Sequence, residues 1–408
     1  MRRSLAVLLT VLGLLPGSAR ALPGASDPSI VIGVVATQTG PGALAGQDMV
    51  DGFNLALRQL GGRFANQEVR VVPVDDQGSP DQAVAQVKRL LERERVDMVL
   101  TGVSTASLAA IAPLLLDQRL FVINLDMAPA AMAGAGCDPY FFDLAAPFDG
   151  THEAAGMYLA TERAGRVVVI GPDTGATDAA VAAFKRTFSG EVAEVLTPRH
   201  GQPVYEAEVA RIRALRPDAV YSLLTGGMSV SFARAFDAAG LRAEIPLVTT
   251  AQAVERPTLP AMGDAGMDVV SIGTWSPDLD SIPNKRMSTE FENELGRPAT
   301  TWVAQGYDAA FLLDSALRTT NGKTGDHEAL RAGLRRADFV SVRGRFRFNT
   351  NHFPILTWYA RKVTRDARGR YTHELRGPIL KDWRDPGAAA CPMRWVEEVP
   401  APAPVKKP

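Results

Sequence analysis

Short apolar runs alternate along the chain with longer segments in which apolar residues recur every three or four positions. The run 30–36 is continuous and rich in β-branched residues, as in a parallel strand buried on both faces. Segment 46–60 then places Met49, Phe53 and Leu57 on one helical face. This alternation predicts parallel sheets covered by helices on both sides. The predicted strands are 30–36, 69–74, 97–100, 120–124, 166–170, 192–196, 219–224, 246–249 and 267–274, with helices at 46–60, 104–116, 151–162, 177–188, 205–215 and 228–239, and one from Pro80.

The alternation forms two similar α/β halves in tandem, the second beginning with helix 151–162. An α-rich stretch follows the second half, and it would supply helices that the first sheet lacks. A final segment, 353–363, has the alternating aromatic pattern of an antiparallel strand. The helices predicted in the α-rich stretch are 283–295, 301–319 and 327–337.

Composition narrows the class of protein. The 408 residues are 46% apolar and 22% charged, which is typical of a globular chain, and the length suggests two domains. The formal net charge is −1, so the surplus of Lys and Arg that binds a phosphate backbone is absent. We therefore expect no nucleic-acid partner.

The N-terminal 21 residues have the pattern of a secretory signal peptide. Arg2 and Arg3 precede the apolar run 5–15, and Ala19-Arg20-Ala21 offers small residues at a cleavage site. The alternative, a membrane anchor, needs about 20 apolar residues, more than this run provides. We expect segment 1–21 to be removed and the mature protein to be soluble outside the cytoplasm. At the other end, segment 396–408 is Pro-rich without an apolar stripe, which predicts a disordered tail.

The chain has two cysteines, Cys137 and Cys391. In an oxidising compartment, two thiols in one chain are expected to pair. A disulfide would hold the C-terminal part against the middle of the chain. The alternative is two buried thiols.

Motifs of catalysis and metal binding match the sequence poorly. The five histidines include no pair at metal-ligand spacing. Segment 102–106, Gly-Val-Ser-Thr-Ala, approximates a nucleophile elbow around Ser104 but ends in Ala where Gly is required. We therefore expect no enzyme, metal or cofactor, with an exported hydrolase that uses Ser104 as the alternative.

Small polar residues follow several predicted strands. Ligands of open α/β sheets bind beyond the carboxyl ends of the strands, where loops and helix N-termini present free amides. We expect the helix that opens at Ser104 to hold a carboxylate through its amides and the hydroxyls of Ser104 and Thr105. The loops in question are 101–107, 125–128, 171–177, 225–229 and 249–252.

A series of short motifs between residues 30 and 360 resembles the type I periplasmic branched-chain amino acid binding family, the solute-binding proteins of ABC transporters. The resemblance implies an α/β fold of two doubly wound, Rossmann-like lobes joined by three hinge crossings, which close on a ligand. The motifs are Ile32-Gly33-Val34, Thr39-Gly40-Pro41 with Gly46, Asp75-Asp76 with Pro80 and Ala83, Val99 to Ser104, Ala112-Pro113 and Gly306-Tyr307-Asp308-Ala309.

The resemblance also implies a domain division, a location and partners. The protein would be a periplasmic monomer that meets a membrane only through an ABC transporter permease. The N-terminal lobe would comprise 29–147 and 275–350, and the C-terminal lobe 148–274 and 351–395.

Site residues follow from the same resemblance. Ser104 matches the family's ligand-holding serine, and Leu125-Asp126-Met127 matches its loop after the fourth strand. The family's acid for an ammonium group, expected near Ala251 or Gln252, is missing, so we expect a ligand other than an ordinary amino acid. The full set of predicted ligand-binding residues is Gly42, Thr101, Ser104, Thr105, Leu125, Asp126, Met127, Thr174, Thr225, Gln252 and Trp275.

Segment 348–354, together with Cys137, resembles the branch of the family that includes aromatic-acid binders. With Ser104 as the anion site, a small organic or aromatic carboxylate or another small apolar solute is expected in the cleft. Met127, Phe142, Trp275 and Tyr307 would form apolar walls. A ligand-sensing module for a membrane receptor is the alternative function.

Overall fold

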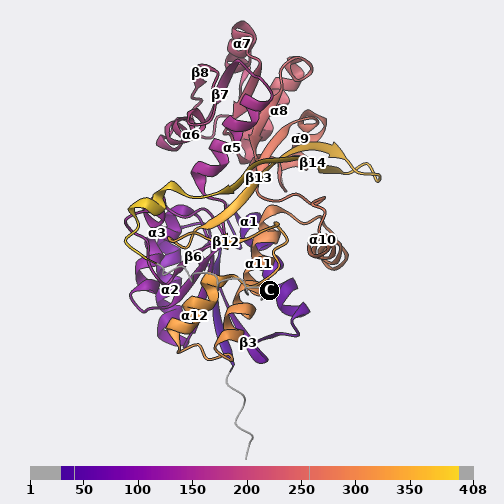
Figure 1. The fold of residues 1–408 in the computed structure, drawn as a ribbon. Helices are drawn as coiled ribbons and strands as arrows, with labels where there is room; N and C mark the ends of the chain where they lie inside the picture. Colours follow the sequence, from indigo (N-terminus) through magenta and orange to yellow (C-terminus); the bar gives the residue numbers. More distant parts are fainter. Residues whose placement is uncertain (1–28, 41, 257, 395–408) are drawn as a thin grey trace, which may run out of the picture.

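Two β-sheets organise the chain, each at the centre of its own α/β lobe (Figure 1). The computed structural model describes residues 29–40, 42–256 and 258–394. The predicted signal peptide, 1–21, and the predicted disordered tail, 396–408, lie outside the described residues. Among the described residues, no helix combines the length and apolar character needed to cross a membrane.

The six-stranded sheet of the first lobe has the order β2-β3-β1-β4-β5-β6. Its strands from β3 to β6 are parallel, and the short β2 pairs antiparallel with β3. Neighbouring residues of β1 face different cores: Ile32 packs with α1 and α11, whereas Val31 and Val35 pack with α2 and α3. The elements are β1 (Ile30–Ala36), α1 (Ala43–Gln59), β2 (Arg63–Phe64), β3 (Gln67–Asp75), α2 (Pro80–Arg93), β4 (Met98–Gly102), α3 (Thr105–Leu116), β5 (Phe121–Asn124), α4 (Ala130–Ala133) and β6 (Phe141–Asp143), with α11 (Thr301–Thr319) and α12 (His327–Arg336) added from later in the chain.

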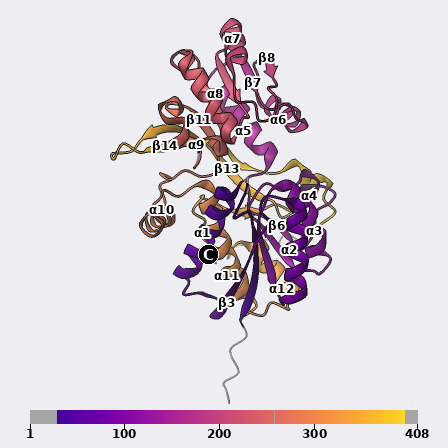
Figure 2. The ribbon, with the colours of Figure 1, turned by 180° about the vertical axis from the view of Figure 1, so that it is seen from behind.

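The second sheet begins with the same strand order. Strands β8-β7-β9-β10-β11 are parallel and repeat the doubly wound order of β3-β1-β4-β5-β6, after which β13 and β14 add an antiparallel edge. Figure 2 shows β13 and β14 between the two lobes from behind. The elements are α5 (Phe148–Thr161), β7 (Arg166–Ile170), α6 (Gly175–Lys185), β8 (Glu191–Leu196), α7 (Glu206–Leu215), β9 (Ala219–Ser222), α8 (Gly226–Ala238), η1 (Leu241–Ala243), β10 (Leu247–Thr250), η2 (Ala251–Val254), α9 (Thr258–Met262), η3 (Gly263–Gly266), β11 (Val270–Gly273), α10 (Ile282–Leu295), β12 (Arg347–Phe348), β13 (Pro354–Arg365), β14 (Tyr371–Trp383) and η4 (Pro386–Ala390).

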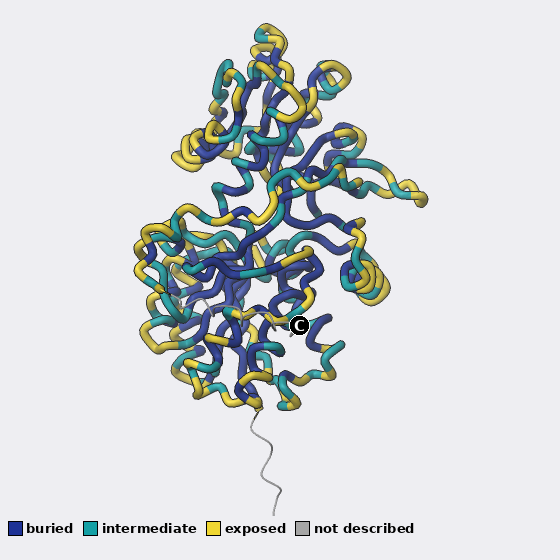
Figure 3. The backbone as a smooth tube through the Cα atoms, viewed as in Figure 1, coloured by how far each residue is buried: buried dark blue, intermediate teal, exposed yellow. Residues whose placement is uncertain are grey.

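Helices α1 and α11 cross so closely that their backbones touch. A methyl group built at Gly52 would lie 2.1 Å from the carbonyl oxygen of Val303, and one at Gly306 would lie 1.9 Å from that of Met49. Only glycine fits at these two positions. The contact holds α11, which comes late in the sequence, against the first lobe. Most residues of α11 are buried (Figure 3).

The predicted pair of doubly wound lobes is confirmed, with element boundaries that differ by a few residues. Strand β4 extends to Gly102, two residues beyond the prediction, and helix α5 begins at Phe148, three residues earlier than predicted. Strands β2, β6, β12 and β14 were not predicted.

The predicted disulfide between Cys137 and Cys391 is confirmed, with the two Cα atoms 5.7 Å apart. It joins the segment after α4 to the segment after η4, and these two elements also pack together. The chain therefore returns from β14 to the first lobe. The sequence-based division had placed all of 351–395 with the second lobe.

Candidate ligand-binding cleft

The candidate site lies where the carboxyl ends of both parallel sheets face each other. In each doubly wound sheet, the loops after the two central strands diverge to opposite faces and leave a crevice. In the first lobe these loops follow β1 and β4 and carry Gly42 and Ser104. In the second they follow β7 and β9 and carry Thr174 and Thr225. The four loops contribute to two adjoining cavities.

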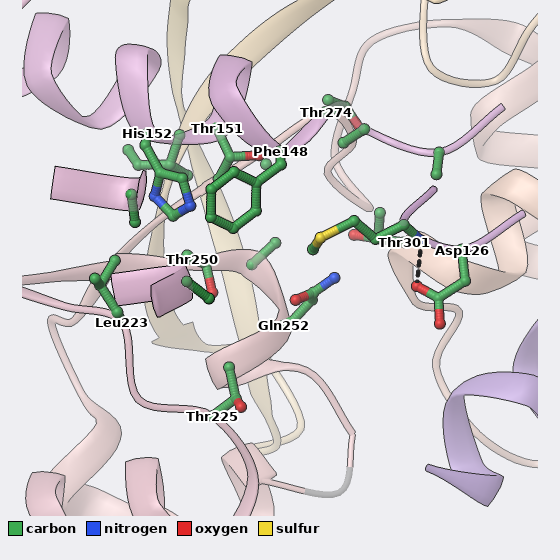
Figure 4. A pocket seen from close by; sticks show the side chains of 18 of the residues that line it. Asp126, Phe148, Thr151, His152, Leu223, Thr225, Thr250, Gln252, Thr274 and Thr301 are labelled. Atoms are coloured by element: carbon green, nitrogen blue, oxygen red, sulfur yellow. Dashed lines mark hydrogen bonds between the residues drawn. The ribbon is translucent and has the colours of Figure 1, made fainter. Parts of the chain in front are cut away.

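The more enclosed cavity, here called the inner chamber, has a volume of about 300 Å³. Small and apolar side chains form most of its wall. Figure 4 shows Phe148 and His152 side by side in this chamber, with Asp126 on the far side. Its lining residues are Asp126, Met127, Ala145, Ala146, Phe148, Thr151, His152, Pro172, Thr174, Ala176, Thr177, Ala180, Leu223, Thr225, Thr250, Ala251, Gln252, Glu255, Ile272, Gly273, Thr274, Thr301, Trp302 and Gln305.

Three buried polar atoms in the wall of the inner chamber have no hydrogen-bond partner among the described residues. They are the hydroxyl oxygens of Thr250 and Thr274 and the side-chain oxygen of Gln305. Buried polar groups are almost always paired in folded proteins.

The wider cavity, here called the outer chamber, has a volume of about 780 Å³ and is lined by more exposed residues. It shares five residues with the inner chamber, so the two form one continuous cleft. The shared residues are Asp126, Met127, Thr225, Gln252 and Trp302, and the outer chamber adds Gly40, Gly42, Ala43, Leu44, Ala45, Ser104, Thr105, Gly226, Gly227, Val230, Arg256, Thr258 and Ala261.

Two helix N-termini from opposite lobes open into the outer chamber. Helix α3 begins at Thr105 and helix α8 at Gly226, and both residues line the chamber. The amides of a first helical turn and the helix dipole favour a negative charge. Arg256 is also among the residues that line this chamber. The outer chamber is therefore suited to an anion.

Ser104 stands at the N-cap of α3. Its Oγ accepts a hydrogen bond from the amide of Ser107 at 3.1 Å and lies 3.2 Å from the Ser107 hydroxyl. The neighbouring Thr105 donates to the carbonyl oxygen of Met127 at 2.8 Å. These bonds fix the first turn of α3 against the loop after β5, and no described general base contacts Ser104.

Two carboxylates line the inner chamber, in different surroundings. Glu255 accepts hydrogen bonds from Arg361 at 2.9 Å and from Thr301 at 2.8 Å, so its charge is already compensated. Asp126 accepts a backbone hydrogen bond from Met127 at 2.8 Å, and it forms no ion pair with a described residue. Burial raises the pKa of Asp126 to about 6, although the Met127 amide opposes this shift.

Arg256 belongs to a small network of ion pairs around Asp48. Its guanidinium lies 3.4 Å from Asp48, which also pairs with Arg297 at 2.6 Å. Arg297 also pairs with Asp51. The two arginines and the two aspartates of this network therefore balance in charge.

The similarity to known proteins agrees with this architecture. A family model described as "Periplasmic binding protein" matches residues 29–369. The chain belongs to the periplasmic binding protein family. Among curated relatives, a Leu/Ile/Val-binding protein homologue from Brucella melitensis is 23% identical over 370 residues, which are 88% of this chain and 94% of the relative.

Solved structures of ABC transporter solute-binding proteins share the fold of this periplasmic binding protein. One from R. palustris, in complex with benzoate, is 24% identical with a TM-score of 0.80, covering 90% of this chain and all of the other. A second R. palustris protein, in complex with 4-hydroxybenzoate, is 25% identical with a TM-score of 0.79, covering 88% of this chain and 99% of the other.

Membership of the family decides between transport and catalysis. Proteins of this family bind solutes for ABC transporters and are not enzymes. This periplasmic binding protein is therefore not the exported hydrolase considered as an alternative. Among the described residues, no group of three or more His, Cys, Asp and Glu side chains is placed to hold a metal ion.

Eight of the predicted ligand-binding residues of this periplasmic binding protein line the cleft. They are Gly42, Ser104, Thr105, Asp126, Met127, Thr174, Thr225 and Gln252.

The other three predicted residues lie in the protein interior. Thr101 belongs to β4 and donates a hydrogen bond to Asn124 at 2.9 Å, because the strand runs further than its pattern indicated. Leu125 is buried in the hydrophobic core. Trp275 is 1% exposed and donates to Asn284 at 2.7 Å. None of the three lines either chamber.

Two further apolar walls expected from the sequence are also absent from the cleft of this periplasmic binding protein. Phe142 stacks on His352 with ring centroids 4.0 Å apart, and the Tyr307 hydroxyl donates to Gln59 at 2.6 Å. Both belong to the core of the first lobe.

Sequence analysis missed several cleft residues. Phe148 lies before the start of the predicted helix 151–162, and His152 lies inside that helix, where no strand end pointed to it. Trp302 lies in a helix far along the chain. Glu255 places an acid three residues after Gln252, close to where one was expected and thought missing. Its engagement with Arg361 could not be seen from the sequence, since β13 follows about a hundred residues later.

Proposed function

We propose that this periplasmic binding protein captures a small organic carboxylate, preferably an aromatic one, between its lobes and delivers it to the permease of an ABC importer. The observation that supports this is the continuity of two chambers of different character. The inner chamber is mostly apolar, and two helix N-termini open into the outer one. A ligand with an apolar body and an anionic end matches both.

The carboxylate end is assigned to the outer chamber. The first turn of α3, capped by Ser104, and the first turn of α8 present amides from opposite lobes. Contacts from both lobes to one anion would favour the closed arrangement, because the ligand then binds it more tightly than the open one. Arg256, which pairs with Asp48, also lines this chamber.

The apolar body is assigned to the inner chamber. Phe148, Leu223, Ile272 and Met127 line it, and a planar ring would bury its faces against them. Support comes from the solved relatives in complex with benzoate and 4-hydroxybenzoate, although their identity to this chain is low.

An amino acid is the second candidate ligand. Asp126 favours it, since this carboxylate lines both chambers and forms no ion pair with a described residue, so it could hold an ammonium group. The Leu/Ile/Val-binding homologues agree with this alternative. The aromatic carboxylate is preferred because the second acid, Glu255, is already paired with Arg361.

Calorimetric titration of the purified protein with benzoate, 4-hydroxybenzoate and L-leucine tests the proposal. We expect saturable binding of the aromatic acids and weak or no binding of leucine. Binding of leucine alone would support the second candidate, and recovery of a chemically altered ligand would contradict a transport role.

Replacing Ser104 with Ala tests the anion site. We expect affinity for the aromatic acid to fall about tenfold, because the substitution removes a hydroxyl and loosens the first turn of α3. Ser281→Ala is the matched control, since Ser281 caps α10 in the same way, accepting from the Asn284 amide at 3.3 Å, and lines neither chamber. Equal affinities of the two variants would contradict the assignment.

Export and delivery are part of the same proposal. We expect the signal peptide, 1–21, to direct the chain to the periplasm, where it acts as a monomer. Cross-linking in membranes should capture an ABC permease in the presence of ligand. Capture of a sensor receptor would favour the ligand-sensing alternative.

A further inference from the structure

The inner chamber ends at a pair of hydrogen-bonded side chains, His152 of α5 and Tyr221 of β9. His152 Nδ1 lies 2.7 Å from the Tyr221 hydroxyl. The Phe148 ring meets the imidazole edge to face at 4.4 Å, and Tyr221 stacks on Phe184 at 5.1 Å. Packing therefore fixes both rings.

The proton between the two side chains can be assigned. Burial raises the pKa of the Tyr221 phenol, so the phenol keeps its proton. Its O–H must donate, and among the described residues the only acceptor bonded to it is His152 Nδ1. Burial lowers the pKa of His152 to about 3, so the imidazole is neutral and carries its single proton on Nε2.

The Nε2–H group is left without a protein acceptor. No hydrogen bond joins His152 Nε2 to any described residue. The residue lines the inner chamber and is only 5% exposed, so bulk water has little access to it. Figure 4 shows His152 on the side of the cavity away from Asp126.

We propose that His152, oriented by Tyr221, is a specificity-determining residue that donates a hydrogen bond to an oxygen at the ligand end remote from the carboxylate. The ligand class narrows to aromatic acids that carry a hydroxyl or carbonyl oxygen on the ring. An unsubstituted acid would leave the Nε2–H desolvated and unpaired, which costs affinity. This inference rests on the proposed function.

The test compares ligands that differ only in a hydroxyl. Wild-type protein is titrated with benzoate against 4-hydroxybenzoate, and with cinnamate against 4-hydroxycinnamate. The pair whose members bind with the higher affinity is used for the comparison. Within that pair, we expect the hydroxylated acid to bind at least about tenfold more tightly than the acid without the hydroxyl. The preference should fall to about twofold or less in His152→Leu, and His152→Gln, which keeps an N–H donor, should restore part of it.

Tyr221→Phe provides a second variant that retains the ring and its stacking on Phe184. It removes the hydrogen bond that orients His152, so we expect the preference to shrink while binding of the unsubstituted acid stays within about threefold. This variant decides the test if His152→Leu fails to fold, as judged by its thermal unfolding.

The outcomes separate this inference from the proposed function. Equal binding of both members of a pair by the wild type, or an unchanged preference in His152→Leu, would overturn the inference and leave the proposed function standing. Failure of every aromatic acid to bind would overturn both.

Discussion

At the residue scale, Asp126 distinguishes the two candidate ligand classes. It lines both chambers, and burial raises its pKa to about 6. The carboxyl is thus mostly charged at pH 7.5 and mostly neutral at pH 5.5. A charged Asp126 repels a ligand carboxylate and attracts an ammonium group.

The pH dependence of binding should therefore have opposite signs for the two classes. We expect affinity for 4-hydroxybenzoate to rise about three- to tenfold from pH 7.5 to pH 5.5, because Asp126 becomes neutral. Affinity for an amino acid would fall over the same range. Titrations at pH 5.5, 6.5 and 7.5 measure this, and a flat profile in Asp126→Asn identifies the group responsible.

The same carboxyl has a predictable effect on folding. Because its pKa is raised in the folded state, its contribution to stability is greatest below about pH 4 and is lost as the pH rises through about 6. We expect Asp126→Asn to raise the free energy of unfolding by about 1 to 3 kcal/mol at pH 7.5 and by little at pH 4. Urea unfolding at both pH values measures this; equal stability of variant and wild type at pH 7.5 would contradict a raised pKa of Asp126 in the folded state.

The cleft residues that could be predicted from the sequence are those that follow closely after the end of a strand. Ser104, Asp126 and Thr225 were predicted because they directly follow strands, and loops after parallel strands converge at one edge. Whether such a residue faces the cleft or the interior was not predictable: Leu125 precedes Asp126 by one position and is buried in the core.

At the element scale, the position of α11 determines part of the cleft. Its N-terminal turn carries Thr301, Trp302 and Gln305 into the inner chamber, and Gly306, on the next turn, sits against α1. The sequence singled out Gly306 as part of a family motif. The structure supplies the physical reason, which is direct contact with the α1 backbone.

We therefore expect Gly306→Ala to destabilise the protein by about 1 to 3 kcal/mol and to weaken ligand binding. The added methyl group would have to push α11 away from the carbonyl of Met49. Gly325→Ala is the control, since a methyl group there meets nothing within 4 Å. Chemical unfolding and calorimetry of both variants check this; similar losses in the two would contradict the role of the close crossing.

Strand prediction succeeded for the central parallel strands and missed β2, β6, β12 and β14. Strand β1 was predicted to the residue because all seven of its residues are buried. Strand β14 was missed because it lies at the sheet edge and most of its residues are partly or fully exposed, among them Glu374, Arg376 and Lys381. Charged residues are common on edge strands, where they prevent pairing with another chain.

At the scale of the whole molecule, the disulfide joins two segments that lie far apart in the sequence. Cys137 and Cys391 are 254 positions apart, and the bridge brings the segment after β14 back to the first lobe. The pairing was predictable from two cysteines in a chain that is expected to be exported. Its route was not, because β14 itself was missed.

Removing the bridge should lower stability without abolishing binding. We expect the double variant Cys137→Ser, Cys391→Ser to lose up to about 5 kcal/mol in the free energy of unfolding, since the unfolded chain gains freedom. Neither cysteine lines the cleft, so ligand affinity should stay within about threefold. Unfolding with and without reductant checks this: reductant should destabilise only the wild type, and an equal effect on both proteins would contradict the prediction.

The proposed ligand is a carboxylate held between the lobes with its ring in the inner chamber. A crystal structure of the protein grown with 4-hydroxybenzoate tests this most directly. We predict the carboxylate at the first turn of α3 beside Ser104, the ring against Phe148, and the hydroxyl at His152 Nε2. Ligand density outside the two chambers, or a carboxylate placed against Asp126 with the ring in the outer chamber, would contradict the account.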